Sequence, residues 1–109
     1  MVDLFLLNGS NWQEFFNKKI TYVMFSKSDC SQCENLEKGL RKLKSTQGIN
    51  FCKLNLDTPG FADLKQTYPW ISRIDALPFN TIFCDGLLVD SWSGYNLETI
   101  ESKLRQLSG

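Results

Sequence analysis

The residues best suited to chemistry are two cysteines separated by two residues, in Cys30-Ser31-Gln32-Cys33. Such a C-x-x-C pair can exchange a dithiol for a disulfide, or it can supply half of a structural zinc site. A structural zinc site needs four ligands, and the chain has no second cysteine pair and no histidine. The missing histidine also excludes serine–histidine and cysteine–histidine nucleophiles. We therefore predict thiol–disulfide exchange at Cys30 and Cys33, with no metal.

Two predicted elements position this pair. The segment Ile20 to Ser26 contains a nearly continuous apolar run, which is typical of a strand buried on both faces. From Ser31 to Lys44, leucines recur at helical spacing opposite a charged face. Cys30 is thus expected at the N-terminus of a helix that follows a strand. Unpaired backbone N–H groups and the helix dipole favour a thiolate there.

The remaining segments continue the alternation of strands and helices. They are a strand over Val2–Leu7, a helix over Asn11–Asn17 capped by Ser10, a strand over Ile49–Leu56, a helix started by Thr58-Pro59 and stopped by Pro69, a loop over Trp70–Leu77, a hairpin of Asn80–Cys84 and Leu87–Trp92 around Asp85-Gly86, and a last helix capped by Asn96 with a buried stripe of Leu97, Ile100, Leu104 and Leu107. The order βαβαβαββα predicts one α/β domain over residues 1–109, with a central mixed sheet flanked by helices on both faces.

The composition limits the partners. The 109 residues are 42% hydrophobic and 22% charged, and 12 basic side chains balance 12 acidic ones. This balance argues against nucleic acid and anionic lipid as partners. No apolar run near the start has the length of a membrane span or of a signal-peptide core. We therefore expect a cytoplasmic monomer that does not bind membranes.

The chain resembles the thioredoxin superfamily over essentially its whole length. Besides the C-x-x-C, Lys53-Leu54-Asn55-Leu56-Asp57 is similar to the third strand of thioredoxins, and Leu77-Pro78 fits their cis-proline. The segments Phe25 to Cys33 and Trp92-Ser93-Gly94-Tyr95 resemble a neighbouring branch, the glutaredoxin-like redoxins that reduce ribonucleotide reductase (NrdH-redoxin type). The resemblance implies the thioredoxin fold.

The chain departs from thioredoxins around the cysteines. No Trp precedes Cys30, no Gly-Pro lies between the cysteines, the loop before Pro78 is longer, and Met24 takes the place of a buried aspartate. The chain also lacks the Pro-Tyr dipeptide and the Gly-Gly and acidic segment of glutaredoxins that use glutathione. Recycling by a flavin-dependent thioredoxin reductase is therefore expected, rather than recycling by glutathione.

The resemblance and thiol chemistry together imply a two-step exchange. Cys30 attacks a client disulfide, and the buried Cys33 resolves the mixed disulfide without a metal or an organic cofactor. A cis Pro78 places Leu77 beside Cys30, with its backbone free to pair with an extended client segment. Trp70 is a candidate lip of that client site, although an aromatic residue near a proline often only closes a loop.

Three residues are candidates for tuning the thiolates. Lys27 either stabilises the Cys30 thiolate or is an ordinary solvated lysine. Met24 leaves Cys33 without the buried acid that helps to deprotonate it in thioredoxins. Lys53 pairs with that acid in thioredoxins, so it loses its partner here and is expected to be structural.

The other cysteines stand alone in apolar strand-like runs. We predict that Cys52 and Cys84 are structural, since a free cysteine often behaves as a small hydrophobe. In the strand order of the family, the strand of Met24 separates them by about 9.5 Å, beyond the limit of ~7 Å for a disulfide. Trp92 and Tyr95 either guide partner recognition or pack.

These features predict a cytoplasmic dithiol-disulfide oxidoreductase that reduces protein disulfides, with ribonucleotide reductase as one client. An alternative of a different class is a binding module or subunit with the same fold, whose redox activity is incidental. An oxidase or isomerase would need a disulfide-rich compartment, against which the lack of a signal peptide argues.

Overall fold

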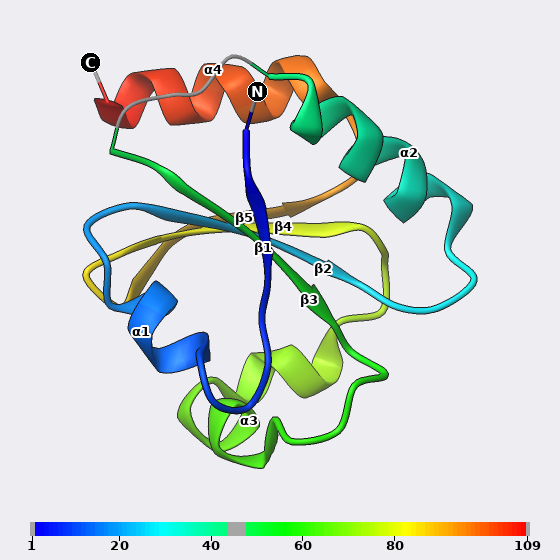
Figure 1. Ribbon diagram of the computed structural model, residues 1–109, viewed down its shortest axis with the longest axis vertical. Helices are drawn as coiled ribbons and strands as arrows, with labels where there is room; N and C mark the ends of the chain where they lie inside the picture. The colour runs from blue at the N-terminus through cyan, green and yellow to red at the C-terminus, as the bar shows by residue number, and fades with distance from the viewer. Residues whose placement is uncertain (1, 44–47, 109) are drawn as a thin grey trace.

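The computed structural model describes residues 2–43 and 48–108. These residues form a central sheet of five strands with helices on both faces (Figure 1). The elements in chain order are β1 (Leu4–Leu6), α1 (Trp12–Phe16), β2 (Thr21–Ser26), α2 (Ser31–Arg41), β3 (Asn50–Asn55), α3 (Ala62–Thr67), the 3₁₀ helix η1 (Pro69–Arg73), β4 (Phe79–Cys84), β5 (Leu87–Ser93) and α4 (Leu97–Ser108).

The strands lie in the order β1-β3-β2-β4-β5. β1, β3 and β2 are parallel, whereas β4 is antiparallel to β2 and β5 is antiparallel to β4. The mixed sheet and the order βαβαβαββα are confirmed, with η1 added before β4. The strand of Met24 separates those of Cys52 and Cys84, as predicted. Helix α2 ends at Arg41, and its predicted end, Lys44, lies outside the described residues.

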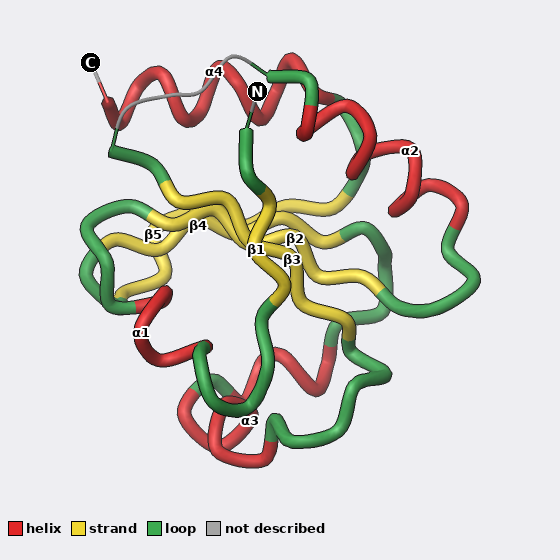
Figure 2. Tube along the Cα trace, viewed as in Figure 1, coloured by secondary structure: helices red, strands yellow, loops and turns green. Residues whose placement is uncertain are grey.

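The helices cover the two faces of the sheet in separate layers (Figure 2). We call the side of α2 and α4 the α2–α4 face and the side of α1, α3 and η1 the α1–α3 face. The helices of the α2–α4 face bury Leu36, Leu40, Ile100 and Leu104. Those of the α1–α3 face bury Trp12, Phe16, Leu64 and Ile71. Because both faces are covered, every residue of β2 is buried, which explains its continuous apolar run.

A tight turn joins β4 to β5. Asp85 and Gly86 both have left-handed backbone angles, with φ of 52° and 85°. This is the geometry of a type I′ turn, which matches the twist of a hairpin. The Asp-Gly pair correctly predicted the hairpin.

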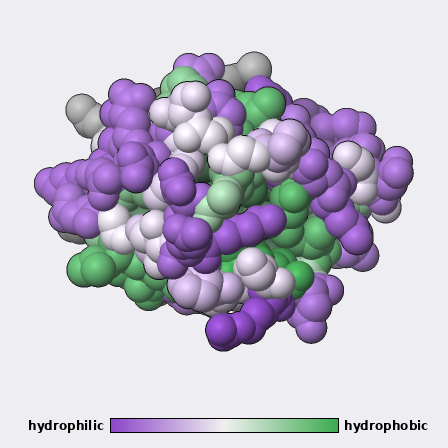
Figure 3. Space-filling model, turned by 90° about the horizontal axis from the view of Figure 1, so that it is seen from below, coloured by the Kyte–Doolittle hydropathy of each residue, from purple (hydrophilic) through white to green (hydrophobic). Residues whose placement is uncertain are grey.

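The edge strand β5 contains a bulge. Ile82 of β4 pairs with Asp90, but Phe83 pairs with Leu88, so Val89 is an extra residue in β5. Leu88 and Val89 are both exposed. Hydrophobic side chains are also exposed between polar ones on the face of the molecule seen in Figure 3.

The start of α1 differs from the prediction, because Ser10 does not cap it. Asn8 and Asn11 instead bind each other's backbone. The N–H of Asn8 donates to Oδ1 of Asn11 at 2.7 Å, and the N–H of Asn11 donates to Oδ1 of Asn8 at 2.9 Å. Asparagine side chains readily form such local turns. Asn11 belongs to this turn, so the helix begins at Trp12; it ends at Phe16.

The prediction for the start of α3 is wrong. Thr58 ends a turn that begins at Asn55, since its N–H donates to the carbonyl of Asn55 at 3.1 Å, and Pro59 follows in a bend. Gly60 follows with a left-handed φ of 102°. This conformation cannot be part of a right-handed helix, so α3 begins only at Ala62.

The C-terminal half shows two smaller differences. Pro69 follows α3 but starts η1, so the predicted loop Trp70–Leu77 is helical in its first part; proline suits the first position of a helix. Asn96 caps α4 as predicted, accepting a backbone hydrogen bond of 3.3 Å at Oδ1. Leu107 is 42% exposed, so the buried stripe of α4 ends at Leu104.

Candidate active site

The C-x-x-C pair lies where β2 leads into α2 (Figure 1). Cys30 is the N-cap residue of α2, with extended backbone angles (φ −110°, ψ 99°). Its Sγ accepts a hydrogen bond of 3.2 Å from the backbone N–H of Cys33. Its carbonyl accepts a helical hydrogen bond of 3.1 Å from Glu34. The sulfur of Cys30 thus occupies the place where a serine or aspartate oxygen usually caps a helix.

Cys30 and Cys33 form a disulfide, and their Cα atoms lie 5.3 Å apart. Cys30 is partly exposed, whereas only 3% of the Cys33 surface is exposed. A molecule from outside can therefore reach Sγ of Cys30 more easily than Sγ of Cys33. In the dithiol form, the N–H of Cys33 and the dipole of α2 stabilise a thiolate on Cys30. The pair can carry two electrons by opening and closing one S–S bond.

The connection before Cys30 is tied to the end of β3. The backbone N–H of Ser28 donates to Oδ2 of Asp57 at 2.9 Å. The connection ends with Asp29 in a left-handed conformation, with φ of 59°. Lys27 and Asp29 are both exposed. Sequence reasoning did not find the role of Asp57, because 29 residues separate it from Ser28.

The peptide bond between Leu77 and Pro78 is cis, as predicted. Pro78 is buried directly before β4, whose first residue, Phe79, pairs with Phe25 near the end of β2. Because α2 begins just beyond β2, Pro78 lies at the same end of the sheet as the disulfide. The backbone N–H of Gly94 donates to the carbonyl of Pro78 at 3.0 Å. The side chain of Leu77 packs against the core of the α1–α3 face.

Met24 is fully buried on the α2–α4 face, in the same cluster as Leu36 and Leu40 of α2. In the sheet it pairs with Lys53 of β3 on one side and with Asn80 of β4 on the other. A thioether cannot accept a proton at neutral pH. The Met24 position therefore supplies no base to the dithiol.

Lys53 has an acidic partner that the sequence analysis missed. Its Nζ lies 2.6 Å from Oε1 of Glu37 on α2, and Oε2 of Glu37 lies 3.3 Å from Nη2 of Arg41. Burial alone would raise the pKa of Glu37, but the hydrogen bonds and charges of Lys53 and Arg41 outweigh it and lower that pKa. Lys53 thus lacks the aspartate partner of thioredoxins but pairs with Glu37 instead. Helical periodicity places Glu37 on the charged face but does not reveal that a strand residue reaches it.

Cys52 and Cys84 are free. Burial raises the pKa of Cys52 to about 12. Burial, and then the charge of Asp85, raise the pKa of Cys84. Both thiols therefore stay protonated at neutral pH and do not compete with Cys30 as nucleophiles.

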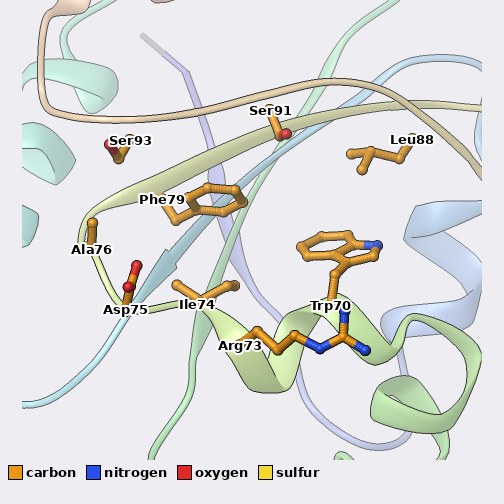
Figure 4. Close-up of a pocket in the computed structure, with 9 residues that line it drawn as sticks. All are labelled: Trp70, Arg73, Ile74, Asp75, Ala76, Phe79, Leu88, Ser91 and Ser93. Carbon is orange, nitrogen blue, oxygen red and sulfur yellow. The ribbon is translucent and has the colours of Figure 1, made fainter.

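Trp70 packs against the core and also borders a cavity (Figure 4). Its ring centroid lies 5.8 Å from that of Phe25 and 6.3 Å from that of Phe83. The cavity has a volume of about 470 Å³ and lies between η1 and β5, with Phe79 and Leu88 in its wall. Trp70 therefore anchors the segment before Pro78 to the core, and part of its surface lines the cavity.

The segment from Trp92 to Tyr95 contains one packed and one exposed aromatic residue. Nζ of Lys103 on α4 lies 4.8 Å from the ring centroid of Trp92 and 2.7 Å from Oδ2 of Asp90. Trp92 is thus held between β5 and α4. Tyr95 is 53% exposed and is accessible to a partner.

In the part of the chain that the structure describes, no group of three or more cysteine, histidine or acidic side chains is placed to hold a metal ion. The described helices include none that is long and apolar enough to cross a membrane.

No family model and no curated protein matches this chain, but solved structures do. The thioredoxin of Malassezia sympodialis superposes with a TM-score of 0.80 at 17% identity, over 100% of this chain and 94% of that one. Spinach chloroplast thioredoxin f (long form) gives 0.81 at 14% identity, over 98% and 88%. The oxidised thioredoxin of Plasmodium falciparum gives 0.78 at 14% identity, over 98% and 100%. The chain therefore has the thioredoxin fold, as its motifs predicted.

Proposed function

We propose that this chain, which combines the thioredoxin fold with a C-x-x-C disulfide, is a dithiol-disulfide oxidoreductase that reduces disulfides in client proteins. One observation carries the proposal: a partly exposed Cys30 is joined to a buried Cys33 across the first turn of a helix. The accessible sulfur can react with a client, and the buried sulfur can then close the cycle.

The reaction proceeds in two exchanges. The Cys30 thiolate attacks one sulfur of the client disulfide; a bond forms between them, and the other client sulfur leaves as a thiolate that takes up a proton. The Cys33 thiolate then attacks Sγ of Cys30. The Cys30–Cys33 disulfide forms, and the second client sulfur leaves as a thiolate. Two electrons have passed from the dithiol to the client.

Cys33 must lose its proton before the second exchange. Met24 offers no base, and Lys53 and Arg41 keep the pKa of Glu37 low. A carboxylate of low pKa is a weak base. The proton of Cys33 therefore passes to solvent or to the departing client thiolate. Resolution of the mixed disulfide is slow near neutral pH and becomes faster as the pH rises.

The client binds beside the cis Pro78. The backbone of Leu77 pairs with an extended segment of the client, a form of strand addition. Ala76, the residue before Leu77, lines the cavity that Trp70 and Phe79 border, so this cavity lies next to the Leu77 backbone. Apolar side chains of the client segment fit into this cavity, because much of its lining is apolar and aromatic.

The segment Trp92-Ser93-Gly94-Tyr95 supports a proposal for the client protein. It resembles redoxins that reduce ribonucleotide reductase, so this enzyme is the client that we propose. A flavin-dependent thioredoxin reductase recycles the disulfide, since the segments that bind glutathione in glutaredoxins are missing. The cytoplasm keeps thiols reduced and is the compartment that this role requires.

The test is the reduction of insulin disulfides, followed by turbidity. Electrons come either from a flavin-dependent thioredoxin reductase or from glutathione with its own reductase. We expect turnover with the thioredoxin reductase and little turnover with glutathione alone. Efficient turnover with glutathione would contradict the proposed recycling partner and leave the dithiol chemistry in place.

Variants of the cysteines test the site itself. Cys33→Ser should trap a mixed disulfide with the client through Cys30, because the resolving thiol is gone. Cys30→Ser should trap none, and Cys52→Ser is the control that keeps full activity. Turnover of insulin by both the Cys30 and the Cys33 variants would exclude the C-x-x-C as the active site. Inactivity of the unmutated dithiol would favour the alternative of a binding module.

A further inference from the structure

A hydrogen-bonded polar pair lies deep in the core of the α2–α4 face. Tyr22 and Asn80 are both fully buried, next to apolar side chains such as Met24 and Ile82. The hydroxyl of Tyr22 donates to Oδ1 of Asn80. Burial raises the pKa of Tyr22, so this hydroxyl keeps its proton. The bond satisfies the buried oxygen of the Asn80 amide.

The amide of Asn80 reaches from the core to the turn after β5. Its Nδ2 donates to the carbonyl of Gly94 at 2.8 Å and to the carbonyl of Trp92 at 3.3 Å. An asparagine amide has two N–H groups and one oxygen. Tyr22 occupies the oxygen, and the NH2 group donates to the carbonyls of Trp92 at the end of β5 and of Gly94 in the turn.

The same turn is also bound to the cis-proline. The N–H of Gly94 donates to the carbonyl of Pro78 at 3.0 Å, so hydrogen bonds hold Gly94 at both its N–H and its carbonyl. A Cβ added to Gly94 would meet no atom within 4 Å. Hydrogen bonds, rather than packing around Gly94, therefore fix this turn. Ser93 and Tyr95 on either side are exposed.

We infer that Asn80, whose amide oxygen is satisfied by Tyr22, is a positioning residue that fixes the turn Ser93–Tyr95 against Pro78 and so shapes the surface on which the client lies. The inference rests on the proposed function. An apolar pair would fill the same core without the need to satisfy a buried hydroxyl and amide. The amide donates instead to two backbone carbonyls, that of Trp92 at the end of β5 and that of Gly94 in the turn.

Two disulfide substrates separate positioning from chemistry. Insulin must dock on the surface beside Pro78, whereas 5,5′-dithiobis(2-nitrobenzoic acid) is small and needs only the thiolate. The test variant is Tyr22→Phe with Asn80→Leu, which removes the whole pair and leaves neither side chain unsatisfied. The matched control is Tyr22→Phe alone, which keeps both bonds from Asn80 to the turn.

We expect the double variant to raise KM for insulin about tenfold or more, since small misplacements of binding groups have large effects. Its kcat for insulin and its rate with the small disulfide should stay unchanged. Tyr22→Phe should leave KM within experimental error. An unchanged KM in the double variant would overturn the inference, as would an equal loss with both substrates. Failure of the unmutated protein with both substrates would instead refute the proposed function.

Hydrogen exchange of the Gly94 amide gives a readout that does not depend on activity. By NMR, this amide should exchange slowly in the unmutated protein and in Tyr22→Phe. It should exchange about tenfold faster or more in the double variant, while amides of β2 stay protected. Fast exchange at Gly94 in the unmutated protein would overturn the inference, even if the double variant does not fold.

Discussion

Met24 lies in register between two polar residues, Lys53 on β3 and Asn80 on β4, and these two residues find their partners in different ways. Lys53 pairs with Glu37 in an ion pair whose side chains keep 27% and 23% of their surface exposed. Asn80 is fully buried and pairs with the neutral hydroxyl of Tyr22. The charged pair thus stays in contact with solvent, and the neutral pair does not.

The difference decides how much each pair matters to stability. Solvent screens an exposed ion pair, whose contribution is typically about 0 to 1 kcal/mol. A buried polar group that loses its partner costs about 1 to 3 kcal/mol. Replacing Lys53 or Glu37, which join α2 to β3, should therefore lower the stability of the fold less than replacing Tyr22 or Asn80. A charge introduced between the two pairs, at the fully buried Met24, would have no contact with solvent.

Met24→Asp should have the largest effect, because it places a carboxylate between the two pairs. We expect the free energy of unfolding to fall on the order of 3 kcal/mol near neutral pH, seen as a lower urea midpoint. Burial favours the neutral acid, so the loss should be small below the ordinary aspartate pKa of about 3.9 and grow as the pH rises. The new acid should also speed resolution of the mixed disulfide at neutral pH.

Met24→Leu is the control for this variant, since it changes shape but adds no charge. It should change both the urea midpoint and the resolving rate only slightly. A loss of stability in Met24→Asp without a faster resolving step would show that the residue does not face the dithiol, or that another base already serves Cys33.

Tyr22→Phe should have an intermediate effect. The change leaves Oδ1 of Asn80 buried without its donor, and we expect a loss of about 1 to 3 kcal/mol in urea unfolding. Tyr22→Phe combined with Asn80→Leu should cost less than the sum of the two single changes, because the double variant leaves no side-chain group of the pair unsatisfied. Additive losses would contradict the pairing.

Glu37→Gln should have the smallest effect, below about 1 kcal/mol at neutral pH. The pKa of Glu37 is lowered in the folded protein, so its contribution is present above the ordinary pKa of about 4.3 and is lost as the pH falls through the folded value. The difference between variant and unmutated protein should therefore vanish in acid. The resolving rate should not change; a slower rate in Glu37→Gln would identify this residue as the missing base.

Local sequence patterns predicted most of the fold. The apolar run of β2, the leucine spacing of α2 and the Asp-Gly turn each depend on residues that are neighbours in the chain. The cis Pro78 came from the resemblance to thioredoxins, since an arbitrary proline is cis in only about 5 to 6% of cases. The placement of Cys30 at the start of α2 followed from two adjacent elements.

The features that the sequence did not reveal depend on contacts across strands. Tyr22 and Asn80 are 58 residues apart, and Tyr22 looks like one more apolar residue in a buried run. The pair becomes visible only when the register of β2 and β4 is known. The prediction for the start of α3 failed for a different reason. Thr58-Pro59 has the residues of a helix start, but a right-handed helix cannot continue through the left-handed Gly60 that follows.

The bulge at Val89 has a consequence for the behaviour of the protein at high concentration. Among the strands that the structure describes, β5 lies at the edge of the sheet, and none pairs with its outer N–H and carbonyl groups. Its exposed Leu88 and Val89 would favour stacking with other chains. The extra residue bends and twists the strand, which breaks the regular row of groups that a second sheet would need. The bulge therefore protects the molecule against edge-to-edge aggregation.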